Sequence, residues 1–337
     1  MRRNRWSLSA KGLAAGFLLT GQLVAASASG QAAAYLNLGV DARILGMGGA
    51  GSTLSKDVNA TYWNPAGLAH MEERQVAFMH TSLSLDRNYN SISYGAPLRN
   101  SDWRFGVAYH RFSVDGIPET RIYDGTNGLP RVDVDGNGRF DDPVLTGDVV
   151  AGNVVNNANR ATAPVQIFSY FEDSESYFSL SAARKFGKKI SLGTSLKLFE
   201  QSLFTADADG LGLDLGVQYQ HSDRAAFGLN VKNMGADLDW STGRKDNIPM
   251  VVTAGTAVKL KSGITVAADV VKREGETMGV RVGTEKWFHD RYGIRVGNNE
   301  GEFTLGASAK LKDWNLDYAY NDEDLGSVQR ISVVRKF

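Results

Sequence analysis

The sequence predicts an all-β fold: a transmembrane antiparallel β-barrel of about 14 strands, with a short N-terminal helical or coil plug segment. Three observations support this prediction. Apolar and polar residues alternate from Gln75 to the C-terminus, and short connections on one predicted rim face long ones on the other. Glycine is common (37 residues) while proline is rare (7), as expected for many strands joined by tight turns.

Residues 1–28 have the features of an export signal peptide. Four basic residues come first, an apolar run from Leu13 to Ala26 follows, and Ala26-Ser27-Ala28 is a cleavage site of the A-x-A type. The apolar run is too short for a stable membrane span. Cleavage would remove four of the 37 basic residues and none of the 37 acidic ones, which leaves a net charge of −4. Such a chain has no electrostatic reason to bind nucleic acid.

Catalysis has little support in the sequence. There is no cysteine, which excludes disulfides, zinc–thiolate sites and cysteine catalysis. The five histidines lie on different predicted elements without the spacing of metal ligands. We therefore expect a protein that is not an enzyme and requires no cofactor.

Residues 29–74 are predicted to form the plug segment. Asn64 can cap the N–H groups that follow it, and Pro65 has a φ suited to the first helical position, so the two should start a short helical turn. A simple capped connector is the alternative. The cluster from Gly46 to Gly51 matches G-x-G-x-x-G, but no βαβ unit surrounds it. Its glycines are expected to let the backbone fold tightly in a confined space.

Residues 75–337 are predicted to form the barrel. In the segment 189–199, for example, leucine and isoleucine alternate with serine, glycine and lysine. Most segments of this kind are near the roughly 9–11 residues that a tilted strand needs to cross a bilayer. The predicted strands are 75–83, 88–97, 103–112, 176–185, 189–202, 210–220, 224–233, 250–260, 263–272, 277–288, 291–298, 302–312, 314–321 and 328–337.

The two predicted rims differ in the length of their connections. One rim has turns of a few residues, whereas the other carries a long loop over 113–175, as in outer-membrane barrels with short periplasmic turns and long extracellular loops. The last residue, Phe337, is in phase with Ile331 and Val333. A C-terminal aromatic residue that closes an alternating strand resembles the signal through which bacterial barrels enter the assembly machinery. The bacterial outer membrane is the expected location, with membrane lipid and the barrel assembly machinery as partners.

The polar face of the predicted strands combines small residues with charges of both signs, which suits a narrow polar lumen. A secreted β-sandwich is the competing prediction, but a sandwich has no reason to make its polar face small and rich in glycine. Aromatic residues near the strand ends suit interfacial girdles. The predicted lumen charges, which we expect to form ion pairs, are Asp214, Asp269, Arg281, Glu285, Arg295, Lys310 and Asp317.

The segment 131–142, RVDVDGNGRFDD, has the spacing of a calcium loop. Gly138 stands at the position of the sharp turn, but Val144 replaces the bidentate glutamate of an EF-hand. A structural Ca²⁺ site and an acidic solvated turn are both open. The candidate ligands are Asp133, Asp135, Asn137, the carbonyl group of Arg139, and Asp141.

The run from Ala33 to Ala69 resembles the start of the PorV/PorQ family, which is related to the FadL-type outer-membrane barrels. The resemblance is strong over residues 33 to about 98 and again at the C-terminus, whereas the middle matches only in its strand pattern. It implies a barrel with its N-terminal segment inside or beneath it. The motif residues are Gly46, Gly48, Gly49, Trp63, Asn64, Pro65, Ala66 and Gly67, together with Ala42-Arg43 and the D-x-x-A step from Asp57 to Ala60.

The resemblance implies two possible functions. PorV-like members act with the type IX secretion machinery as barrels that accept exported cargo for surface attachment. FadL-like barrels pass hydrophobic small molecules sideways into the membrane. Because the predicted lumen is small and charged, and no proline interrupts a predicted strand except at its ends, the sequence favours a secretion-linked barrel with secretion subunits and cargo proteins as partners. Transport of hydrophobic small molecules is the alternative.

Overall fold

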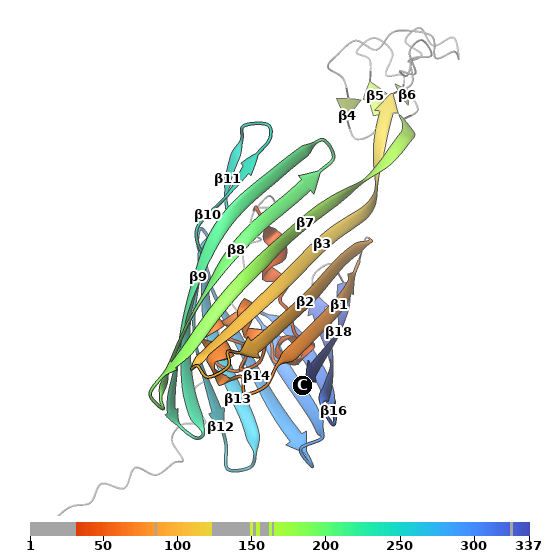
Figure 1. Cartoon of the computed structure of the whole chain (residues 1–337). Coiled ribbons are helices and arrows are strands. Elements are labelled where there is room, and N and C mark those ends of the chain that lie inside the picture. Colours follow the sequence, from red (N-terminus) through yellow and green to blue (C-terminus); the bar gives the residue numbers. More distant parts are fainter. Residues whose placement is uncertain are drawn as a thin grey trace, which may run out of the picture. The chain divides into compact units, whose positions relative to one another are not determined.

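The computed structural model describes residues 32–84, 86–122, 149–150, 153–155, 162–163, 165–323 and 326–337. In this part of the chain, fifteen strands form one antiparallel sheet. Fourteen of them close into a barrel, because β18 pairs with β1 and β9 pairs with β10, while β11 is a short addition to β10. The predicted barrel of about 14 strands is confirmed, and Figure 1 shows its tilted strands.

Every predicted strand has a counterpart among the described residues. The barrel strands are β1 (Gln75–Leu83), β2 (Arg87–Pro97), β3 (Trp103–Ile122), β7 (Val165–Phe186), β8 (Ile190–Leu203), β9 (Ala206–Ser222), β10 (Ala225–Trp240), β12 (Val251–Lys259), β13 (Ile264–Arg273), β14 (Met278–Phe288), β15 (Tyr292–Asn299), β16 (Glu302–Leu311), β17 (Trp314–Glu323) and β18 (Gly326–Lys336). The shorter strands are β4 (Val149–Val150), β5 (Asn153–Val155), β6 (Thr162–Ala163) and β11 (Lys245–Asn247).

Two strands extend well beyond their predicted ends. β3 continues to Ile122 and β7 begins at Val165, so the connection between them is shorter than the predicted loop of 113–175 (Figure 1). Pro118 lies inside β3, opposite Tyr170, in the part of the strand beyond its predicted end, so the absence of proline from the predicted strands does not extend to the observed ones. The alternating pattern does not predict this extension, for a physical reason. Where both faces of a hairpin are in water, its backbone hydrogen bonds can continue without alternating apolar and polar residues.

The wall has an apolar outer face and a polar inner face. On β8, Leu196 and Leu198 are exposed, whereas Ser195 and Lys197, which alternate with them, are buried. Aromatic side chains such as Trp103 are exposed at the rim that carries the short turns. At the same rim, the guanidinium of Arg335 lies 4.9 Å from the ring centroid of Trp314 and 4.5 Å from that of Phe337. Arg335 therefore faces outward and is covered by aromatic rings.

Four short helices precede the barrel: η1 (Ala34–Asn37), α1 (Ala42–Leu45), α2 (Ala60–Trp63) and η2 (Pro65–His70). They belong to the segment 32–74, which we call the plug, and Figure 1 shows it in red and orange inside the ring of strands. η2 packs against β7, β8 and β9, and α1 packs against β16, β17 and β18. None of the helices in the described ranges has the length and apolar character that a membrane span requires.

Candidate functional site

The plug backbone touches the wall at glycine residues of the strands. A Cβ atom added to Gly193 on β8 would lie less than 3.0 Å from the carbonyl group of Pro65 and from the nitrogen of Ala66. A Cβ atom on Gly216 of β9 would collide with the side-chain oxygen of Asn64. The glycine-rich inner face predicted from the sequence therefore has a steric role, because any larger residue would push the plug away from the wall.

Asn64 is fully buried and joins the plug to two strands of the wall. Its side-chain oxygen accepts a hydrogen bond of 3.1 Å from the N–H of Ala66, which caps η2 at Pro65. Its side-chain nitrogen donates to the carbonyl oxygen of Ser52 at 2.8 Å and to that of Val217 on β9 at 3.2 Å. A longer contact of 3.5 Å reaches β10. The residue thus works both as a helix cap and as a bridge to the barrel.

The other motif residues hold the plug against itself and against the wall. The indole N–H of Trp63 donates to the carbonyl oxygen of Val40 at 2.9 Å, and the carbonyl oxygen of Trp63 accepts from Asn230 of β10. A Cβ atom on Gly67 would collide with the carbonyl oxygen of Ser55. The motif residues from Trp63 to Gly67 therefore form a packing unit that contacts both the plug and the wall.

The glycine cluster after α1 lies against β14, β15 and β16. Gly48 has a left-handed φ of 66°, and a Cβ atom there would collide with carbonyl oxygens of Val282 and Asn298. The N–H of Gly48 donates to the hydroxyl of Thr304 at 3.0 Å. Gly46 meets the backbone of Gly306 in the same way, and Gly49 has a φ of 73°. Tight backbone packing explains this cluster without a nucleotide.

Glu285 is the centre of an ion network that joins α1 to the wall. It accepts two hydrogen bonds from the guanidinium of Arg43, at 2.9 and 3.0 Å, and one of 2.7 Å from Arg295. Arg295 also lies 3.5 Å from Asp317. The side chains of Glu285, Arg295 and Asp317 are at most 4% exposed, so this part of the network is protected from solvent, whereas the Arg43 side chain is 26% exposed.

The remaining lumen charges have partners of several kinds. Asp269 accepts from the N–H and the hydroxyl of Ser52 in the plug, at 2.9 and 2.7 Å, and does not form an ion pair in the described region. Asp214 pairs with Lys197 at 2.8 Å. Two further cations follow: Arg281 pairs with Glu300 at 2.8 Å, and the ammonium of Lys310 lies 3.9 Å from the ring centroid of Trp287.

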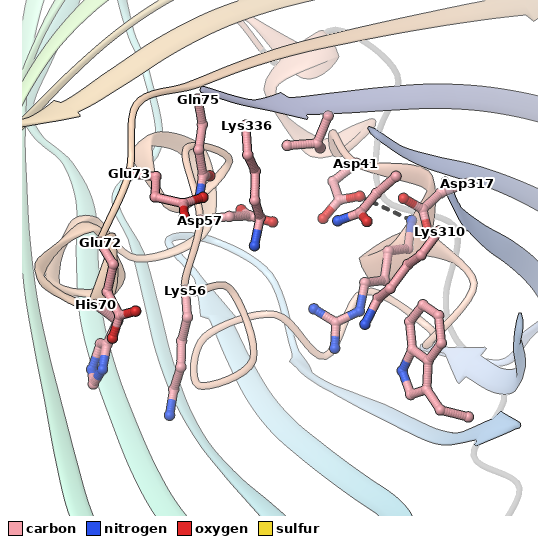
Figure 2. A pocket seen from close by; sticks show the side chains of 14 residues that line it. Asp41, Lys56, Asp57, His70, Glu72, Glu73, Gln75, Lys310, Asp317 and Lys336 are labelled. Carbon is pink, nitrogen blue, oxygen red and sulfur yellow. Dashed lines mark hydrogen bonds between the residues drawn. The ribbon is translucent and has the colours of Figure 1, made fainter. Parts of the chain in front are cut away.

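A cavity of about 330 Å³ opens at the rim with the short turns, and we call it the mouth cavity. Figure 2 shows Asp41 and Asp317 on one side of it and His70 and Lys56 on the other. Asp41 has a φ of 69°, unusual for a residue with a side chain. Burial, followed by repulsion from Asp57 and Asp317, raises the pKa of Asp41 well above its usual value. Burial also lowers the pKa of His70 to about 3, helped by the nearby charge of Lys56.

A second cavity of about 180 Å³ lies toward the rim with the long loops, and we call it the inner cavity. The plug contributes Leu38, Leu45 and Trp63 to its wall, and the barrel contributes Asn321 and Arg330 among others. The mouth cavity and the inner cavity share no lining residue. The plug lines both, so it separates them.

The structure also shows two inward-facing residues, His110 and Arg330, that are not among the predicted site residues; for His110 the alternation had predicted the lumen face and a satisfied polar side chain. The ring of His110 on β3 stacks on that of Tyr177 at 4.4 Å, and neither ring nitrogen of His110 has a hydrogen-bond partner among the described residues. Arg330 is 1% exposed and points inward. The signal for both was the period-2 pattern, which places Arg330 next to the outward-facing Ile331. The candidate calcium ligands from Asp133 to Asp141 lie outside the described residues and stay a prediction.

The pair β9–β10 is irregular where it leaves the predicted membrane-spanning part. Its register shifts between Val231 and Met234 and again between Met234 and Asp237. Asn233 and Gly235, both within these shifts, have left-handed φ angles of 59° and 61°. Such bulges locally disrupt the hydrogen-bond ladder. A strand can therefore kink here without proline, which the sequence argument against a side exit did not consider.

Comparisons with solved structures agree on the fold. The toluene transporter TodX of Pseudomonas putida is 14% identical with a TM-score of 0.57, and the match covers 89% of this chain and 99% of TodX. The toluene transporter TbuX of Ralstonia pickettii is 13% identical (TM-score 0.55, 89% and 98% covered). A FadL homologue of Pseudomonas aeruginosa is 10% identical (TM-score 0.52, 86% and 96% covered). No protein-family model and no curated protein matches the sequence. The chain therefore has the fold of FadL-like outer-membrane barrels.

Proposed function

We propose that this protein is a barrel of the bacterial outer membrane that carries small, largely apolar molecules across that membrane. The observation that carries the proposal is a closed barrel whose plug borders cavities toward both rims. The likeness in fold to transporters of toluene supports the same proposal, and so does the apolar outer face of the wall. The proposal reverses the preference drawn from the sequence, which placed a secretion-linked barrel first.

The proposed path starts on the side of the long loops. A molecule enters the inner cavity and meets the plug at Leu45 and Trp63. The barrel residues that line the inner cavity are on β14 to β18, so we propose that the molecule then passes along the plug to the irregular pair β9–β10. It leaves sideways there, because the register shifts weaken the ladder. The ion network around Glu285 lies on another part of the wall, so it can hold the plug while a molecule passes.

A cross-link provides the test, because the chain has no cysteine of its own. Leu213 and Met234 face each other at the register shift, and L213C/M234C would lock β9 to β10 there. We expect proteoliposomes with the wild-type barrel to take up toluene and the oxidised variant to fall to the level of empty liposomes, with recovery after reduction. The matched control, I92C/Y109C, joins the regular pair β2–β3 and should leave uptake unchanged. No uptake by the wild-type barrel would refute the transport proposal itself.

A secretion-linked role is the second candidate, and the mouth cavity favours it. Charges of both signs line this cavity at the rim that would face the periplasm, where a partner protein could engage Lys56, Glu72 or Lys336. The resemblance of residues 33–98 to PorV/PorQ proteins supports it too. Co-purification from the native membrane would decide between the two candidates: recovery of secretion subunits or cargo proteins favours this one, and their absence together with toluene uptake rejects it.

A further inference from the structure

The inner cavity contains buried polar atoms that lack partners in the described part of the chain. Arg330 is 1% exposed, and one of its terminal nitrogens donates to Glu323 at 2.7 Å. The Nε and Nη1 atoms of Arg330 have no partner there, nor does the side-chain oxygen of Asn321, which is 2% exposed. Both residues line the inner cavity, and the three atoms are covered by neighbouring atoms, so a ligand reaches these unused donors and this unused acceptor after a small turn of the two side chains. Buried groups of this kind cost free energy unless something binds them.

The rest of the inner cavity suits a ring. Leu38, Leu45 and Trp63 provide an apolar side. Its volume of about 180 Å³ is slightly above the ~150 Å³ of an engineered protein cavity that binds benzene. The size therefore fits a single aromatic ring with a small substituent.

The charges around the inner cavity are balanced. Glu323 neutralises Arg330, and Glu300 lies 2.8 Å from Arg281, which also lines the cavity. A carboxylate ligand would find no excess positive charge and would meet Glu323 as well. A neutral ligand avoids this repulsion.

We propose that the inner cavity binds small neutral aromatic molecules that carry a hydroxyl group, that is, phenols. The ring lies against Leu38, Leu45 and Trp63, the hydroxyl oxygen accepts from Arg330, and the hydroxyl hydrogen is donated to Asn321. This inference rests on the proposed transport function and adds a substrate class to it. A hydrocarbon of equal size leaves Arg330 and Asn321 without partners, and a site built for a hydroxyl discriminates against such a ligand.

Calorimetric titration of the purified full-length barrel with phenol and with toluene tests the proposal, since the two differ by a hydroxyl in place of a methyl group. We expect the wild-type barrel to bind phenol at least about tenfold more tightly. The variant R330M/E323Q removes the donors without leaving the carboxylate of Glu323 unpaired, and it should lose most of the preference for phenol, because only Asn321 can still bind the hydroxyl. The matched control R111M/E172Q removes an exposed ion pair on β3 and β7 and should keep the preference.

A second variant covers the case in which R330M/E323Q does not fold. N321L removes the whole side-chain amide, and with it the acceptor, while it keeps Arg330. It should lower the affinity for phenol while sparing that for toluene. Equal affinities in the wild type, heat from neither compound because the cavity holds only water, or a preference that survives in both variants would overturn the inference. Uptake into proteoliposomes distinguishes the two proposals. Toluene uptake without preferential binding of phenol would reject only phenols as the substrate class. Preferential binding of phenol without any uptake would reject only the transport function.

Discussion

The two ends of the plug are held to the barrel by different kinds of contact. At α1, the guanidinium of Arg43 makes a bidentate ion pair with Glu285, which Arg295 also contacts. At the start of η2, Asn64 makes hydrogen bonds to backbone groups, and the chain lies directly on Gly193 and Gly216. We call these the ionic end and the hydrogen-bonded end.

The difference shows what each end can tolerate. An ion pair out of water is costly to break, because a charge is left without a partner, but its strength depends on protonation. Each neutral hydrogen bond at the hydrogen-bonded end contributes less free energy, and these bonds respond little to pH. They do require the plug backbone to fit closely against the glycines of the wall. The ionic end should therefore be sensitive to charge, and the hydrogen-bonded end to volume.

The largest effect is expected from Glu285→Gln at the ionic end. The change takes the carboxylate from between Arg43 and Arg295 and leaves Arg295 only the longer contact of 3.5 Å with Asp317, so we expect a loss of about 3–5 kcal/mol in the free energy of unfolding. Urea unfolding of the barrel in lipid vesicles measures it. The control Glu276→Gln removes a more exposed partner of Arg273 at 3.3 Å and should cost less than about 1 kcal/mol. Similar losses in the two variants would contradict the importance of the ionic end.

The next effect is expected from Gly193→Val at the hydrogen-bonded end. A side chain here meets the backbone of Pro65 and Ala66, which has no room to move, so we expect a loss near 3 kcal/mol or displacement of the plug. The neighbouring change Leu192→Val affects an outward-facing, exposed side chain on the same strand and should be nearly neutral. Protease cleavage of the plug and the unfolding midpoint report the two outcomes. A well-folded, protected Gly193→Val barrel would show that the glycines are not steric.

The wall could be predicted from the sequence because its physics is local and periodic. A strand with lipid on one face and a polar lumen on the other must alternate, and all fourteen predicted strands are present. The prediction of the strands is incomplete where a strand no longer lies between lipid and the polar lumen. β3 and β7 continue where the alternating pattern is lost, and the bulge of β10 depends on Asn233 adopting a left-handed φ, which Asn residues do only occasionally.

The plug contacts could be predicted only in part, because they join residues far apart in the chain. The cap of Asn64 on η2 is local and follows from the Asn-Pro pair. The pairing of Arg43 with Glu285 spans 242 positions and requires the closed barrel. Likewise, the alternation places Arg330 inside, but its position beside Asn321 in one cavity depends on how β17 and β18 pack around the plug.

A smaller effect is expected from Asn64→Ala, which removes the cap and the bridge while leaving the contact of Gly193 with the backbone of Pro65 and Ala66 intact. We expect a loss of about 1–2 kcal/mol, since one cap and neutral hydrogen bonds disappear. Asn59→Ala is the matched control: Asn59 precedes α2 and is also buried, but its side chain makes no capping hydrogen bond. The same unfolding measurement applies, with pore conductance as a second readout of a loosened plug. Equal losses for the two asparagines would mean that Asn64 is only a filler of space.

The smallest effect is a change of less than about tenfold in the rate of amide hydrogen exchange, and its dependence on pH should differ between the two ends of the plug. Burial raises the pKa of Asp41 at the ionic end, so the seated plug retains a proton that the released plug gives up. This stabilisation is fully present below the ordinary aspartate pKa of about 4 and is lost as the pH rises through the raised value. Burial lowers the pKa of His70, at the far end of η2, to about 3. Its contribution is present above the ordinary histidine pKa of about 6.5 and is lost as the pH falls toward 3.

The two ends should therefore respond to acid in opposite directions. Between pH 8 and pH 5, hydrogen exchange corrected for its intrinsic rate should slow at the amide of Leu45, which bonds to Asp41 in α1, and accelerate at the amide of Met71, which bonds to Leu68 in η2. Asp41→Asn keeps an oxygen for the cap and should abolish only the first change, while His70→Gln should abolish only the second. If both amides changed together in the wild type, the plug would leave its seat as a single unit, and the distinction between an ionic and a hydrogen-bonded end would have no energetic meaning.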